Sequence, residues 1–286
     1  MLMSILTTLN SRILSGEKQI KLDCKDEFET EKGFVCILDK SDLEIDFGGM
    51  QVKSGERFVE IKNSKNVVIK NLKLTSRANF AITIVNSENV LIESCELKAK
   101  SVCITSEKST VCIKKSEFIL GNGVCISGDS NVDVTLCNFG SGVGEGITVI
   151  DNSFGKVTAI ENAFKKNFVA LKSAGRNQIR FANNYCTCSK SAIEIIPSFF
   201  KDKMGAYHVE VEYNMFDETG EAVIVIEGNK NAKIHLLVQI HDNIFLGKNS
   251  PAIKANGVEK LSFKNNNVKT DKESEVVNSV INGIVC

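Results

Sequence analysis

The chain has 286 residues, with 35 basic and 35 acidic side chains and a formal net charge of zero. A neutral chain without a long run of like charge lacks the electrostatic signature of a nucleic-acid binder or of a protein held on an anionic membrane, so neither partner is expected. No segment is apolar over the length that a transmembrane helix requires.

Residues 1–15 are predicted to form a short amphipathic helix that caps the rest of the chain. Apolar side chains recur there at helical spacing, at Leu2, Ile5, Leu6, Leu9, Ile13 and Leu14. The segment lacks the basic start and apolar core of a signal peptide, and it lacks the basic face of a membrane-surface anchor. Its expected role is to cover the exposed edge at one end of a stack of strands.

From residue 16 to about residue 275 a short signature recurs every 21 to 31 residues. It consists of an asparagine, a small residue or in one case a leucine, then one variable residue and an apolar residue. The matches are Gly48-x-Met50, Leu72-x-Leu74, Cys95-x-Leu97, Ser116-x-Phe118, Cys137-x-Phe139, Asn162-x-Phe164, Asn183-x-Tyr185, Asn214-x-Phe216, Asn243-x-Phe245 and Asn266-x-Val268. A period of this length is typical of one supersecondary unit stacked on copies of itself.

Most repeats contain two short β-type runs, such as residues 59–61 and 67–69, joined by a turn rich in Asn and Ser. Strands this short, repeated at this period, can pair in parallel with the coil below. Identical positions then stack along the rod. We expect the asparagine amides to hydrogen-bond from coil to coil, and the apolar residues two positions later to stack inside.

These features resemble the right-handed parallel β-helix family, the pectin-lyase-like fold of pectate lyases, polygalacturonases and phage tailspikes. The resemblance implies an all-β, single-stranded right-handed parallel β-helix of about ten coils over residues 16–275, with residues 276–286 closing the last coil. The fold hosts many functions, and the motif sets of pectate lyases and polygalacturonases are absent from this chain. No catalytic residue is therefore transferred from the family.

Most of the ten cysteines fall at repeat positions, so we interpret them as small residues within the rungs and not as disulfides. Cys186-x-Cys188 has no second pair, and the three histidines are scattered, so no metal site and no cofactor are expected. Free thiols and the missing export signals together predict a cytoplasmic location.

The resemblance places a candidate site on the outer face of the first strand of each repeat. That outward column is predicted to be Glu60, Thr83, Cys103, Cys125, Thr148, Ala170, Glu194 and Ile224. Lys172, Glu194 and Glu227 are expected within one or two rungs of each other, as candidate catalytic residues. Two carboxylates suit glycoside hydrolysis, and a cation beside a carboxylate suits proton abstraction in a lyase or an epimerase. Alternatively, these are the polar residues that any exposed sheet face carries.

A long insertion, residues 197–207, directly follows the predicted strand that carries Glu194 and is a candidate binding loop. Phe199, Phe200 and Tyr207 are expected to stack on sugar rings, and Arg176 and Lys254 to contact the same ligand. The alternative is that the two phenylalanines fold down as a local cover over the sheet.

We therefore expect a carbohydrate-interacting β-helix protein that binds or modifies a polysaccharide on the outer face of one sheet. If it is an enzyme, the activity is similar to that of a polysaccharide lyase or a glycoside hydrolase. One alternative is a structural or interaction rod, monomeric or homotrimeric, with an exposed apolar stripe beginning at Val85, Val149 and Ile224. The other is a degenerate pectin-lyase-like protein without activity.

Overall fold

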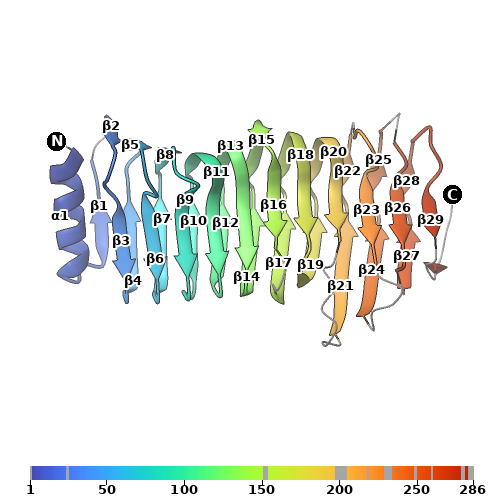
Figure 1. Cartoon of the computed structure of the whole chain (residues 1–286), viewed down its shortest axis with the longest axis horizontal. Helices are drawn as coiled ribbons and strands as arrows, with labels where there is room; N and C mark the ends of the chain where they lie inside the picture. The colour runs from blue at the N-terminus through green and yellow to red at the C-terminus, as the bar shows by residue number, and fades with distance from the viewer. Residues whose placement is uncertain are drawn as a thin grey trace.

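A computed structural model describes residues 2–23, 26–150, 154–196, 205–217, 219–228, 234–247, 250–258, 260–277 and 281–282. These residues form one helix, α1 (Leu2–Leu14), and thirty strands. The coils follow one another along the longest axis, with α1 at one end and β29 (Glu275–Val277) near the other (Figure 1). Neighbouring coils pair in parallel, as in β4 with β7 and β12 with β14. The predicted all-β parallel solenoid of about ten turns with an N-terminal helix is confirmed.

Each coil contributes strands to three parallel ladders, here called columns 1, 2 and 3, which the chain visits in the order 3, 1, 2. Column 1 contains β3 (Val35–Leu38), β6 (Val59–Lys62), β9 (Phe80–Val85), β16 (Glu145–Val149), β23 (Ile224–Glu227), β26 (Ile253–Asn256) and β29. Column 2 contains β1 (Gln19–Lys21), β4 (Ser41–Asp46), β7 (Lys65–Lys70), β10 (Val90–Glu93), β12 (Thr110–Lys114), β14 (Asp129–Thr135), β17 (Phe154–Ile160), β19 (Arg176–Ala182), β21 (Gly205–Glu212), β24 (Ile234–His241), β27 (Lys260–Lys264) and β30 (Ile281–Asn282).

Column 3 contains β2 (Glu27–Thr30), β5 (Gln51–Ser54), β8 (Lys73–Ser76), β15 (Asn138–Val143), β22 (Met215–Phe216), β25 (Ile244–Phe245) and β28 (Asn267–Val268). Four longer strands run through the bend and serve columns 3 and 1 in turn: β11 (Glu96–Glu107), β13 (Glu117–Ser127), β18 (Ala163–Ser173) and β20 (Tyr185–Ile195). The predicted two strands per repeat are columns 1 and 2. Column 3 was recognised in the sequence only as the apolar end of the repeated signature.

The predicted asparagine ladder is present in the turn between columns 2 and 3. The Nδ2 of Asn184 donates to the Oδ1 of Asn214 at 3.1 Å, and the Nδ2 of Asn214 donates to the Oδ1 of Asn243 at 2.9 Å. Each of these oxygens also accepts the backbone N–H of the asparagine one coil before. Upstream, the same position holds Ser116, whose hydroxyl accepts the backbone N–H of Cys95 at 3.2 Å.

Two frames of the signature were wrong. Asn184, not Asn183, belongs to the ladder, because Asn183 adopts the left-handed conformation (φ 54°) that precedes each ladder residue. The first match likewise shifts from Gly48-x-Met50 to Met50-x-Val52, since Val52 pairs in register with Leu74. The error at Asn183 arose because the turn offers two neighbouring asparagines, and the first match was misplaced because its ladder position holds a methionine.

Serine forms a second ladder, in the turn between columns 1 and 2, which the sequence showed only as a turn. The hydroxyl of each serine accepts the backbone N–H of the residue one coil before, as in Ser87 to Ser64 (3.1 Å), Ser109 to Ser87 (3.0 Å) and Ser130 to Ser109 (3.2 Å). Buried turn amides therefore find side-chain acceptors at two corners of the coil.

The interior is a continuous apolar core in which equivalent residues stack. The rings of Phe118, Phe139 and Phe164 lie 4.6 Å apart between successive centroids and are nearly parallel. At the N-terminal end, Leu9 and Ile13 of α1 are buried against the first coil, which supports the predicted capping helix. Leu14 does not belong to that apolar face, because it is 75% exposed. In the part of the chain that the structure describes, no helix is long and apolar enough to cross a membrane.

Candidate functional site

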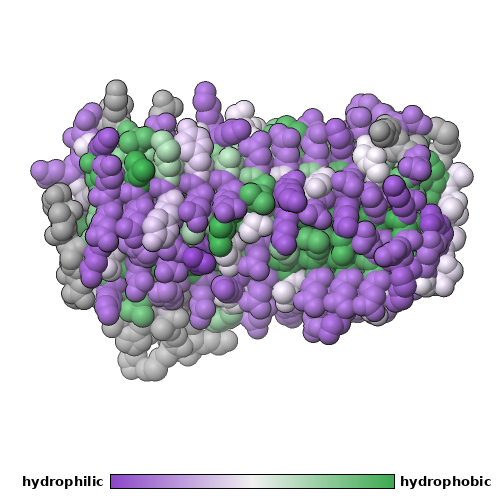
Figure 2. All heavy atoms as spheres, turned by 180° about the vertical axis from the view of Figure 1, so that it is seen from behind, coloured by the Kyte–Doolittle hydropathy of each residue, from purple (hydrophilic) through white to green (hydrophobic). Residues whose placement is uncertain are grey.

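The outward residues of column 1 form one continuous line along the rod. Reading the strand register from coil to coil, the line is Cys36, Glu60, Thr83, Thr105, Cys125, Thr148, Lys172, Glu194, Val225, Lys254 and Glu275. Viewed from behind, the surface of the rod is mainly polar, with apolar areas between the polar rows (Figure 2).

Three predicted members of this line, Cys103, Ala170 and Ile224, are wrong because all three are buried. The outward residues in their coils are Thr105, Lys172 and Val225. For Cys103 and Ala170 the cause is that the pairing of β11 with β13 and of β18 with β20 contains register shifts within the bend. Such a bulge moves the strand face by an amount that an alternation pattern does not reveal.

Lys172 and Glu194 are register partners in β18 and β20. This agrees with the predicted separation of one or two rungs, although Ala170 and not Lys172 was predicted as the outward residue of that coil. The Lys172 ammonium forms an ion pair with Glu145 at 2.7 Å between Nζ and Oε1. The other oxygen of Glu145 accepts a hydrogen bond from the Thr148 hydroxyl at 2.8 Å. Both carboxylate oxygens of Glu145 therefore have partners, and the charge of Lys172 is neutralised by Glu145 from the preceding coil.

Glu194 has a different partner and is only 2% exposed. Its Oε1 lies 2.7 Å from the Nζ of Lys190, in the same strand. This ion pair raises the pKa of Lys190, outweighing the opposite effect of burial. The Lys190 ammonium also lies over the ring of Phe168, 5.4 Å from its centroid. We call Glu145, Lys172, Lys190 and Glu194 the column 1 charge cluster.

Glu227 and Lys254 lie further along the same face, in a shallow hollow of about 240 Å³. Glu275 also lines this hollow, and Lys254 forms an ion pair with it at 3.5 Å. Val225 occupies the outward position between Glu194 and Lys254. From the strand spacing and rise, the Cα atoms of Glu194 and Glu227 are roughly 8 Å apart.

Of the other predicted binding residues, Tyr207 does not join this face. Tyr207 lies in column 2 and is only 3% exposed, because β21 begins at Gly205 and turns the tyrosine inward. Arg176 begins β19, also in column 2, and its side chain lies outside the described residues. Phe199 and Phe200 lie outside the described residues altogether.

Sequence reasoning missed Glu145, Phe168 and Lys190 as parts of this site. Phe168 and Lys190 lie in the bend between columns 3 and 1, where β18 and β20 bulge and the two-residue alternation is interrupted. Phe168 is 49% exposed, although it precedes the fully buried residues 169–171. A large aromatic next to a complete apolar run was the one signal available, and it is equally typical of a core residue.

The three-column parallel coil defines the chain as a β-solenoid. It belongs to the family described as the right handed beta helix region, which it matches over residues 31–186, more than half of its length. No curated protein sequence matches the chain.

Solved structures share the fold at low sequence identity. The surface protein and adhesin PfbA of Streptococcus pneumoniae matches with a TM-score of 0.65 at 11% identity, covering 98% of this chain and 93% of that one. An alginate lyase from Paenibacillus sp. str. FPU-7 matches with a TM-score of 0.62 at 12% identity, covering 97% of each chain. An exopolygalacturonase from Thermotoga maritima matches with a TM-score of 0.52 at 18% identity. The match covers 80% of this chain and only 55% of the exopolygalacturonase chain.

Proposed function

We propose that the chain binds a polysaccharide or oligosaccharide along the outer face of column 1, centred on the column 1 charge cluster. The observation that carries this proposal is the half-exposed ring of Phe168 beside fixed charged groups. A sugar ring needs an apolar surface for its C–H face and directed polar groups for its hydroxyls. Phe168 supplies the first, and Lys172 and Thr148 supply the second.

Two of the structural neighbours support this proposal by their names, an exopolygalacturonase and an alginate lyase. Because their identity to this chain is below 20%, they support the fold as a platform for glycans and specify no sugar.

Binding is favoured over catalysis by the pairing of the charges. Glu194 is buried and paired with Lys190, and Lys172 is paired with Glu145, so neither candidate is poised as a free acid or base. A lyase or glycoside hydrolase activity would require a substrate to displace Lys190 from Glu194. Glu194 with Glu227 would then be the carboxylate pair to test.

The experiment is a glycan-array screen of the purified chain beside three variants. We expect Phe168→Ala and Lys172→Gln each to lower binding at least tenfold, while Leu120→Ala leaves it unchanged. Leu120 is the matched control, because it is a 53% exposed apolar residue in the equivalent bend of an earlier coil, outside the charge cluster. Failure of the wild type to bind any glycan, or equal binding by all variants, would refute the proposal.

Lateral self-association is a second candidate, and one observation favours it. Tyr185, Met215 and Ile244 are register partners on column 3, and each is 37–41% exposed. Of the stripe predicted to begin at Val85, Val149 and Ile224, only Val85 is partly exposed, and Val149 and Ile224 point into the core. If column 3 supports a homotrimer, sedimentation will show a trimer that Met215→Lys dissociates. A wild type that stays monomeric at high concentration would exclude this.

We further propose that the chain functions in a reducing compartment, such as the cytoplasm. All eight cysteines in the described part of the chain carry free thiols, and most of these are buried in rungs. This pattern is typical of proteins that are not exposed to disulfide-forming conditions.

A further inference from the structure

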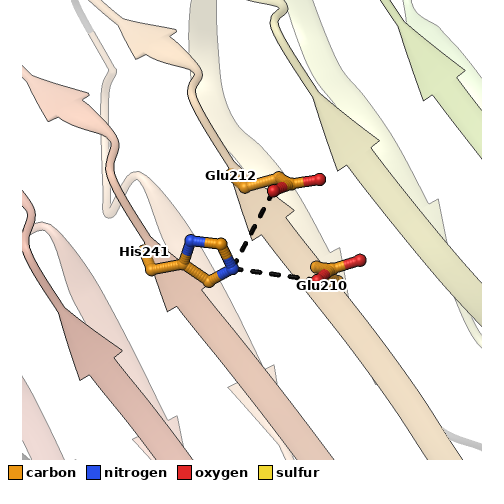
Figure 3. Close-up of side chains that lie close together, drawn as sticks. All are labelled: Glu210, Glu212 and His241. Atoms are coloured by element: carbon orange, nitrogen blue, oxygen red, sulfur yellow. Dashed lines mark ion pairs between the residues drawn. The ribbon is translucent and has the colours of Figure 1, made fainter.

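Three potential metal ligands converge on the outer face of column 2, away from the column 1 charge cluster. Glu210 and Glu212 project from β21, and His241 projects from β24, the next strand (Figure 3). The Nε2 of His241 lies 3.8 Å from the Oε1 of Glu210 and 4.0 Å from the Oε2 of Glu212. All three ligand atoms lie within 4.8 Å of one another.

The second ring nitrogen of His241 is already committed. Nδ1 lies 2.9 Å from the Oδ2 of Asp242, and because a carboxylate only accepts, Nδ1 carries the proton in that contact. In the neutral ring, Nε2 then directs its lone pair at the two glutamates. In the charged ring, the contacts of 3.8 and 4.0 Å are too long for hydrogen bonds. In neither protonation state of the ring does a direct hydrogen bond join Nε2 of His241 to the facing oxygens of Glu210 and Glu212.

Arg180 holds the two carboxylates from the opposite side. Its guanidinium hydrogen-bonds Oε1 of Glu212, with Nε at 2.8 Å, and lies 3.6 Å from Oε2 of Glu210. The arginine therefore takes one oxygen of each glutamate and leaves the other oxygen facing His241. The side chain of Glu212 is only 8% exposed, which fixes its orientation. Asp242, which lies against Nδ1 of His241, adds a third carboxylate to the group, and Lys264 is the register partner of His241 on the far side.

The two distances from His241 Nε2 to the glutamate oxygens, 3.8 and 4.0 Å, fit a bridging cation. Metal bonds of about 2.1 Å to nitrogen and oxygen allow donor separations of about 3–4 Å. An imidazole with two carboxylates suits a first-row dication more than Ca²⁺ or Mg²⁺, which prefer oxygen alone. A carboxylate on the distal nitrogen of a ligating histidine is also the usual supporting contact in such sites.

We propose that Glu210, Glu212 and His241 form a binding site for a divalent first-row metal, Zn²⁺ or Mn²⁺, whose remaining coordination positions are filled by water. This revises the expectation that the histidines form no metal site. His241 lies 29 residues after Glu212 and 31 after Glu210 in the chain, so only the stacking of β21 on β24 brings it to the two glutamates.

The test is a titration of the full chain with Mn²⁺, followed by loss of the free-ion EPR signal. Mn²⁺ is chosen because the free thiols of this chain compete for Zn²⁺ but bind Mn²⁺ poorly. We expect one saturable site, which His241→Gln weakens at least tenfold. Asp242→Asn should weaken it about 10- to 100-fold by misorienting the imidazole. Asparagine is compatible with the positive φ of 56° at that position.

Glu93→Gln is the matched control, since Glu93 is an outward carboxylate of column 2 in an early coil, paired with Lys115 and not with a histidine. It should leave Mn²⁺ binding unchanged. Zn²⁺ should displace the bound Mn²⁺, because zinc binds such donors more tightly. Circular dichroism verifies that each variant is folded. The proposal is overturned if the wild type shows no saturable site, or if folded His241→Gln binds Mn²⁺ as the wild type does.

Discussion

Replacement of Asn214 by alanine tests whether the asparagine ladder stabilises the coils. Asn214 is 1% exposed and takes part in four hydrogen bonds through its side chain. Its Nδ2 donates to Asn243 at 2.9 Å and to the backbone carbonyl of Phe181 at 2.8 Å. Its Oδ1 accepts the backbone N–H of Asn184 at 2.8 Å and the Nδ2 of the same residue at 3.1 Å.

The expected loss follows from these four contacts. A net contribution of about 1 kcal/mol for each hydrogen bond amounts to about 4 kcal/mol. In the variant, the buried backbone N–H of Asn184 has lost its side-chain acceptor. Because an unpaired buried donor is costly, the total destabilisation should stay at about 4 kcal/mol, as about 1 kcal/mol for each of the four bonds gives. Alanine also leaves a small cavity in the turn, which adds to the destabilisation. We therefore expect Asn214→Ala to lower the free energy of unfolding by about 3–5 kcal/mol.

The assay is urea unfolding followed by circular dichroism, with the exposed amide of Gln178 in β19 as the control. Gln178→Ala should change the free energy of unfolding by less than about 0.5 kcal/mol. A loss below about 1 kcal/mol in Asn214→Ala would refute the ladder as a major source of stability.

Three further outcomes are expected. Phe139→Ala should cost about 3–5 kcal/mol in urea unfolding, because its ring is stacked at 4.6 Å on both sides; a cost below about 1 kcal/mol would contradict the stacking. Burial raises the pKa of Asp46, but hydrogen bonds from Asn71 and a backbone N–H, with nearby lysines, outweigh it and lower that pKa below 3.8. The stability that ionised Asp46 contributes is therefore present above its ordinary pKa and is lost in acid. The difference in unfolding free energy between the wild type and Asp46→Asn should accordingly shrink from about pH 6 to about pH 3 in acid-titrated unfolding. A constant difference would refute this. In native alkylation read by mass spectrometry, exposed Cys36 should react well before Cys137, whose pKa burial raises to about 12, and equal rates would contradict that burial.

The fold was predictable because one pattern is repeated many times. An error in any single repeat, such as the choice of Asn183 for Asn184, does not disturb the period of the others. Column 3 was harder to recognise as a strand, since β22 and β25 are only two residues long. A strand of two residues has no alternation to detect.

The candidate site was predictable only where regular strands carry it. Lys172 and Glu194 were correctly expected within one or two rungs, because Lys172 directly follows the apolar residues 169–171 and Glu194 lies between Ile193 and Ile195 of the next coil. Phe168 and Lys190 were not found, because bulges in the bend set their direction. His241 was not connected with Glu212, since the number of residues in that coil decides which side chains meet on adjacent rungs.

Polysaccharide binding on column 1 is best examined by determining a crystal structure of the chain with the highest-scoring glycan from the array. We predict a sugar ring stacked on Phe168, with hydroxyls in contact with Lys172 and Thr148. A glycan bound instead on column 2 or column 3, with column 1 bare, would contradict the proposed function.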